Sequence, residues 1–352
     1  MLTPPSPAES SPDQSTPGSL RPRNRMIRVW GATILFAFSI VVGSILGVVS
    51  PASGSAVGGL LDGTILLLVT LLLFEVQFRR LRGGARDGRF LAVAWVANFI
   101  AIPALAFVIA SLFLSGEPLL FVGVMIYFVS PCTDWFLGFT RMAHGNTSLG
   151  AVLLPLNMIT QLVLFPLFLI LFAKTETGVD PLRIVGTLLQ WFIVPLVIAA
   201  LARLALHFLA SAAFARVIRS FVARIIPFTI AAVILQIFAA NVGTILSNAA
   251  DFAVILIAVF FFFVATFALS EALSRLFRFD YPEHALLTMT TAARNAPLML
   301  ALTVVALPNE PLVYSAIIIG MLIEFPHLTA ITQILLRRRR SIRVHEKSVS
   351  IS

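Results

Sequence analysis

Long apolar runs separated by short polar segments repeat along almost the whole chain. Each run covers about twenty residues or more, enough for a helix to cross roughly 30 Å of hydrocarbon at about 1.5 Å per residue. The pattern predicts an all-α polytopic membrane protein with ten transmembrane helices. We place the ten spans at residues 27–49, 56–77, 90–114, 118–142, 148–173, 182–206, 225–247, 252–276, 284–307 and 310–336.

The two ends of the chain lack this pattern. Residues 1–26 begin with a segment rich in proline and serine, and residues 337–352 are basic and polar. Segments of this kind cannot bury a core, so we expect both tails to be disordered. The membrane domain is then 27–336, with a first half at 27–173 and a second at 182–336.

Composition supports the membrane assignment. Hydrophobic residues make up 59% of the 352 residues and charged residues 12%, against about 25% charged in soluble domains. The one cysteine excludes an internal disulfide and a zinc cluster built on several cysteines.

The basic residues fix the expected orientation. If the N-terminus is cytoplasmic, the cytoplasmic segments hold 22 of the 25 Lys and Arg residues, as the positive-inside rule requires. The net charge of +9 is therefore a topology signal, and we expect no nucleic acid as a partner. We place the protein in the plasma (inner) membrane with both termini in the cytoplasm.

Five spans are an odd number, so two related five-span halves must have opposite orientations, as in many secondary transporters. Polar residues and a proline interrupt the apolar run at matching places in both halves. The fourth span carries Ser130-Pro131-Cys132-Thr133-Asp134, and the ninth carries Thr290 to Pro297. Single proline kinks are common packing features, but a matched pair of breaks favours a substrate site where helices 4 and 9 cross.

Several side chains near these breaks could carry chemistry. Cys132 is a soft ligand suited to trivalent arsenic or antimony, or a buried cysteine without function. Arg294 must pair or face water at this depth; Asp134 and Glu324 are the expected partners, in a proton-coupling device or a structural ion pair. Neutral groups suited to hydrating a small oxyacid include Thr133, Asn157, Gln161, Thr290, Thr291 and Asn295. Asp62 either lines the pathway or lies near the outer end of its span.

Four stretches, 130–146, 154–167, 290–304 and 318–328, resemble the bile acid/sodium symporter superfamily, and within it the arsenical-resistance branch. The shared patterns are Pro-Cys-Thr in the fourth span, Leu-Asn in the fifth and Leu-Ile-Glu-x-Pro in the tenth. The resemblance implies crossed broken helices and proton-driven efflux of arsenite or antimonite. It also implies that Cys132 is the metalloid-linked cysteine and Glu324 the carboxylate of the tenth span.

The sequence departs from the family pattern at Asp134, Met321 and Arg294, so a sodium-coupled symporter of a small organic anion is the alternative. Either function needs a small solute, protons or sodium, and a lipid bilayer as partners, with no cofactor and no bound metal. An enzyme is not expected, since no His-Glu-x-x-His, Gly-x-Ser-x-Gly or P-loop pattern occurs.

Overall fold

The computed structural model describes residues 22–75, 87–133, 135–177, 181–248 and 250–349. Every regular element in these ranges is a helix, which confirms the all-helical prediction for this part of the chain. In chain order the elements are α1 (Pro22–Val49), α2 (Pro51–Gly58), α3 (Leu61–Glu75), α4 (Gly88–Val96), the π-helical turn η2 (Ala97–Ala101), α5 (Ile102–Leu114), α6 (Pro118–Phe128), α7 (Trp135–Met142), α8 (Thr147–Thr177), α9 (Pro181–Leu209), α10 (Ala212–Ser247), α11 (Asp251–Leu276), α12 (Tyr281–Ala292), α13 (Ala296–Ala306) and α14 (Pro311–Val349).

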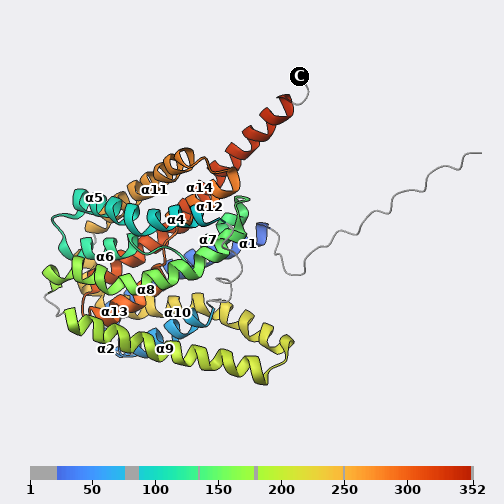
Figure 1. The fold of residues 1–352 in the computed structure, drawn as a ribbon. Coiled ribbons are helices and arrows are strands. Elements are labelled where there is room, and N and C mark those ends of the chain that lie inside the picture. The colour runs from blue at the N-terminus through green and yellow to red at the C-terminus, as the bar shows by residue number, and fades with distance from the viewer. Residues whose placement is uncertain (1–21, 76–86, 134, 178–180, 249, 350–352) are drawn as a thin grey trace, which may run out of the picture.

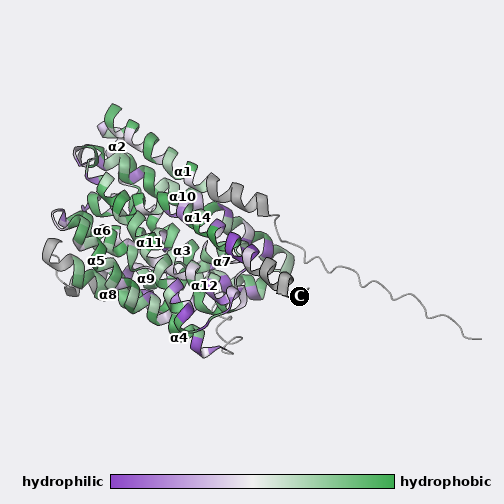
Figure 2. Cartoon of the chain, turned by 90° about the horizontal axis from the view of Figure 1, so that it is seen from above, coloured by the Kyte–Doolittle hydropathy of each residue, from purple (hydrophilic) through white to green (hydrophobic). Residues whose placement is uncertain are grey.

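The helices have the length and apolarity of a multi-pass membrane protein, as predicted. Among the described residues, seven helices are long and apolar enough to span a membrane, or eight if the bent pair α2 and α3 is one span. Hydrophobic residues make up most of the helices, and hydrophilic ones gather near the ends of α4, α7, α12 and α14 (Figure 2). The predicted ten spans are not reached on this count, because α6, α7, α12 and α13 are each too short to qualify alone.

The helices form two groups that each draw on both halves of the chain (Figure 1). In the first, which we call the outer bundle, α1, α2 and α3 pack with α9 and α10. In the second, the crossing bundle, α4 to α8 pack with α11, α12, α13 and α14. The two bundles meet chiefly where α13 touches α3 and α9, α8 touches α9, and α14 touches α1 and α10.

Glycines bring α1 and α2 into backbone contact with α10. A Cβ atom at Gly43 would lie 2.5 Å from the Leu235 carbonyl oxygen, and one at Gly47 or Gly54 would lie 2.4 Å from that of Ala239. Small residues of this kind are what allows membrane helices to approach closely. α1 and α2 are therefore held against α10 by main-chain contact rather than by long side chains.

The crossing bundle buries its short helices. Most residues of α6, α12 and α13 are buried, whereas only 11% of the most apolar part of α9 is buried. Irregular backbone at membrane depth is tolerated only where protein surrounds it or where it lines a cavity. The breaks between α6 and α7 and between α12 and α13 meet this requirement.

The predicted tails are described only in part. Residues 1–21 lie outside the described residues, and α1 already begins at Pro22. At the other end, α14 continues through the basic segment to Val349, so the expected irregular tail is an extension of the last helix. Arginines are good helix formers and lengthen a helix that is already nucleated.

Candidate functional site

The first interruption lies between α6 and α7. α6 ends at Phe128, and α7 begins at Trp135. Pro131 has no backbone N–H and favours extended backbone at Ser130, so the helical hydrogen-bond ladder stops here. The Ser130 hydroxyl donates to the Ile126 carbonyl (2.7 Å), which satisfies one acceptor of the last turn.

The second interruption lies between α12 and α13. α12 ends at Ala292, and Ala293 is extended (φ −75°, ψ 140°). Asn295 stands at the N-cap position of α13, and Pro297 lies in the first turn, where its missing N–H would have no helical partner anyway. Both breaks therefore follow from local sequence, as predicted.

The two breaks cross and pair with each other. Pro131 and Arg294 face one another in a short antiparallel bridge. Its two hydrogen bonds run from Cys132 N to Ala293 O (3.0 Å) and from Asn295 N to Ser130 O (2.8 Å). Backbone groups that lost their helical partners thus satisfy each other, which removes the cost of leaving them bare in hydrocarbon.

Arg294 joins the ends of two half-helices and is completely buried. Its guanidinium donates to carbonyls in the last turns of α6 and α12, namely those of Phe128 (2.8 Å), Ala292 (3.2 Å), Thr290 (3.3 Å) and Thr291. Its cationic carbon lies 5.4 Å from the centre of the Phe262 ring. Helix C-termini carry partial negative charge, so a fixed cation between two of them is stabilised.

Glu324 contacts the crossing from α14. One carboxylate oxygen accepts the backbone N–H of Arg294 (2.9 Å), and the other accepts the hydroxyl of Tyr127 (3.3 Å). Gly320 makes room for this tyrosine, because a Cβ atom there would lie 2.6 Å from the ring. The sequence predicts Asp134 and Glu324 as partners of the Arg294 side chain. In the structure the guanidinium donates its hydrogen bonds to backbone carbonyls, and Glu324 accepts the backbone N–H of Arg294. Asp134 lies outside the described residues.

Two buried asparagines contact Thr290, one turn before Arg294, and a third buried amide, Gln161, lies one turn after Asn157 on α8. The side-chain nitrogens of Asn98 and Asn157 donate to the Thr290 hydroxyl (3.1 and 3.2 Å). The side-chain oxygens of both asparagines, and both polar atoms of Gln161, have no hydrogen-bond partner among the described residues. Buried amides are normally satisfied, so these groups are available to a solute or to water.

The predicted site residues mostly come together. Cys132, Arg294, Asn295 and Glu324 lie at the crossing and are at most 4% exposed. The Asn295 amide donates to the Thr133 hydroxyl (3.2 Å), which links the two breaks through side chains. Asn157 belongs to the neighbouring amide group. Asp62 does not contribute: it is exposed in the first turn of α3, where an acid suits the helix dipole.

Sequence reasoning missed two members of the site, Tyr127 and Asn98. Asn98 lies in the π-helical turn Ala97–Ala101, and such turns often mark functional positions. A single asparagine in a long apolar run was the one signal for it. Tyr127 gave no signal, because a tyrosine before a helix break is ordinary.

Two sequence comparisons relate the chain to known proteins. The sequence profile of the Sodium Bile acid symporter family matches residues 64–248, more than half of the chain. The chain is also 24% identical over 348 residues to the Arsenical-resistance protein Acr3 of Corynebacterium glutamicum. This similarity covers 93% of the chain and 92% of the relative.

Proposed function

We propose that this chain, which belongs to the Sodium Bile acid symporter family, exports arsenite or antimonite in exchange for protons by alternating access. The observation that carries the proposal is the crossing itself, where Cys132 lies beside paired helix breaks and is closed to solvent. The similarity to an arsenical-resistance protein along nearly the whole chain supports the choice of substrate.

Cys132 supplies the soft ligand in this proposal. At neutral pH arsenite is the uncharged acid As(OH)₃. The thiol would condense with it, forming one S–As bond and releasing one water molecule, and hydrolysis would reverse the step. A single thiolate ligand binds more weakly than a set of several, which suits a carrier that must release its cargo. Thr133, Asn157 and Asn295 would hydrogen-bond the hydroxyl groups of the substrate.

Glu324, Arg294 and Asp134 would provide the coupling. Arg294 is a fixed cation at the centre of the protein, so a sodium ion beside it would be repelled. Glu324 already touches the Arg294 backbone, and protonation of this carboxylate would weaken that contact. Asp134, the acid of the first break in the sequence, would act as a second carboxylate. Binding of one proton to Glu324 would thereby weaken the pairing of the two helix breaks when the substrate leaves.

Ten membrane crossings follow if each broken pair is one crossing. The pairs α6–α7 and α12–α13 then add two spans to the eight found by length and apolarity. The chain divides into inverted repeats at 27–173 and 182–336, a basic extension at 337–352 and an N-terminal tail at 1–26. Both bundles take helices from each half, as expected of such repeats. The distribution of arginines supports a plasma (inner) membrane protein with cytoplasmic termini.

Transport in proteoliposomes tests the proposal. With an imposed proton gradient, the purified chain should move arsenite, measured by elemental detection, and Cys132→Ser and Glu324→Gln should each abolish this movement. Arg224→Gln on α10, an exposed residue far along the chain from the crossing, serves as the matched control. If both site variants transport at the control rate, these residue roles are wrong.

The alternative is sodium-coupled symport of a small organic anion, which the family name favours. Arg294 would then bind the anion directly. Uptake would rise with a sodium gradient and would be indifferent to Cys132→Ser. The same proteoliposomes, with sodium replacing the proton gradient and a bile acid or a short carboxylate replacing arsenite, distinguish the two functions.

A further inference from the structure

A second polar site lies away from the crossing, where the C-terminal end of α11 meets the start of α12 and the far part of α14. It encloses a cavity of about 240 Å³, room for several water molecules of about 30 Å³ each. The lining residues are Ser274, Arg275, Arg278, Phe279, Asp280, Tyr281, His284 and Arg338.

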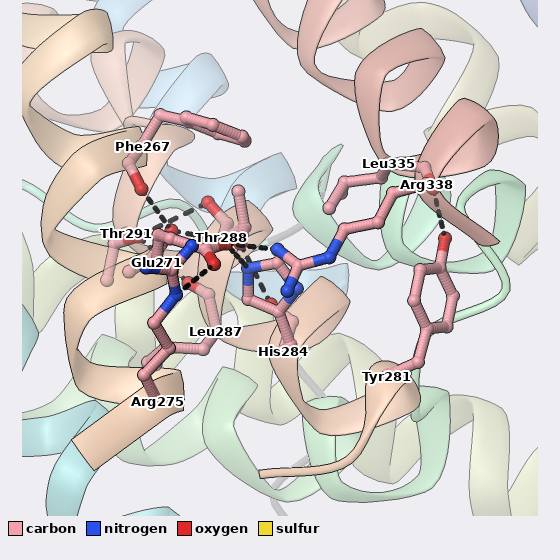
Figure 3. A network of polar contacts seen from close by, with 11 residues as sticks. Phe267, Glu271, Arg275, Tyr281, His284, Leu287, Thr288, Thr291, Leu335 and Arg338 are labelled. Atoms are coloured by element: carbon pink, nitrogen blue, oxygen red, sulfur yellow. Dashed lines mark hydrogen bonds and ion pairs between the residues drawn. The ribbon is translucent and has the colours of Figure 1, made fainter. Parts of the chain in front are cut away.

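Positive charge dominates this lining. Three arginines face one aspartate, and that aspartate is occupied: its side chain caps α12 by accepting the Glu283 N–H (2.8 Å). Arg275 on α11 and Arg338 on α14 both bind the carboxylate of Glu271 on α11, which is not part of the cavity lining (Figure 3). No carboxylate among the described residues pairs with Arg278.

Glu271 offsets one of these positive charges and holds Arg275 and Arg338 in place. Its carboxylate also lies 3.2 Å from His284 Nε2, so this acid pairs with arginines of α11 and α14 and lies beside a side chain of α12. A guanidinium has five N–H donors, and a single carboxylate cannot use those of both arginines. Donors therefore remain for a ligand in the cavity.

A buried hydroxyl completes the site. Ser274 is 7% exposed, lines the cavity and has no hydrogen-bond partner for its Oγ among the described residues. Most buried hydroxyls are satisfied, so this one points to a missing acceptor. Three arginines and a hydroxyl donor are the usual complement of a phosphate group.

We propose that this cavity binds a phosphate-class oxyanion, supplied by the headgroup of an anionic phospholipid or by a soluble phosphate. The cavity lies at the ends of two candidate spans, Asp251–Leu276 and Pro311–Ser341, which is the depth of lipid headgroups. A bound phosphate would link α11, the turn before α12 and α14 through Arg275, Arg278 and Arg338.

Native mass spectrometry and thermal unfolding of the full chain test this site. Nanodiscs of phosphatidylcholine with and without phosphatidylglycerol form one arm, and inorganic phosphate added to detergent-solubilised protein forms the other. Retained phosphatidylglycerol with a raised Tm identifies a lipid headgroup, and a raised Tm with phosphate alone identifies a soluble phosphate. Either result supports the site.

Two mild variants decide whether the effect belongs to the cavity. Arg278→Gln and Ser274→Ala remove one donor each without touching the Glu271 ion pairs, and each should lower anion retention or the Tm shift at least severalfold. Arg224→Gln removes an exposed arginine outside the lining and should change neither. The proposal is overturned if wild-type protein responds to neither anion, or if both cavity variants respond like Arg224→Gln.

Discussion

Replacing Arg294 by lysine should weaken the crossing even though the charge is kept. The guanidinium contacts carbonyls of two separate half-helices, at Phe128 on α6 and at Thr290, Thr291 and Ala292 on α12. Its planar fork can reach in both directions at once. A lysine ammonium is a compact group on a flexible stem and cannot bridge the two helix ends in the same way.

The loss can be estimated from the hydrogen bonds. At least two bonds to the guanidinium disappear, and hydrogen bonds to charged groups contribute about 1.5–3 kcal/mol each. The crossing should therefore lose about 3–6 kcal/mol of local stability. Because about 1.4 kcal/mol is a factor of ten, opening of the crossing should become roughly a hundredfold more frequent, or more.

The single cysteine provides the assay. Cys132 is completely buried at the crossing, so a maleimide can react only when the crossing opens or the protein unfolds. Labelling of Arg294→Lys at 25 °C should be roughly a hundredfold faster than that of the wild type, with a lower Tm in the same detergent. Arg224→Lys is the matched control.

This reasoning is refuted if Arg294→Lys is labelled at the wild-type rate and unfolds at the wild-type Tm. That result would mean that a positive charge alone stabilises the two helix ends. The hydrogen bonds by which one guanidinium bridges the two helix ends would then be incidental.

Three further predictions concern packing, the amide group and pH. Gly320→Ala should lower the Tm by placing a methyl group 2.6 Å from the Tyr127 ring, at a cost of about 1–3 kcal/mol; Gly63→Ala, with open space around it, should not. Asn98→Leu should reduce arsenite transport in proteoliposomes while the protein still reaches the membrane in normal amount; unchanged transport would remove Asn98 from the site. Glu283 precedes the predicted ninth span, and burial and the nearby Asp87 carboxyl raise its pKa above 4.5. The folded state therefore binds this proton more tightly, so its stabilising effect is present below pH 4.5 and is lost as pH rises through the raised pKa. The free energy of unfolding of Glu283→Gln, measured between pH 4 and 7, should not show this loss of stability as pH rises. A variant whose stability falls with pH as steeply as that of the wild type would contradict the assignment to Glu283.

The sequence was a good guide to the breaks and a poor guide to their partners. Pro131 and Pro297 act on their own turns of backbone, so a local pattern reveals where each helix stops. The partners of Arg294 are carbonyls freed by a break on another helix, which no local pattern contains. Asn98 reaches Thr290 across nearly two hundred residues, so its role depends on packing that the sequence does not display.

The grouping of helices into two bundles was beyond sequence reasoning for a similar reason. Long apolar helices look alike in composition, and in lipid their association depends on shape rather than on hydrophobicity. The position of Gly47 against the α10 backbone is such a matter of shape. Its significance becomes visible only when both helices are in place.

The main-chain contact of α1 and α2 with α10 limits which surfaces can slide during a transport cycle. Helices that touch through their backbones cannot shift past one another without collision, so these three should travel as one rigid body. Relative movement is then left to the seam formed by α13 with α3 and α9, by α8 with α9, and by α14 with α1 and α10. A chemical staple between α1 and α10 should leave turnover intact, whereas one between α13 and α9 should arrest it.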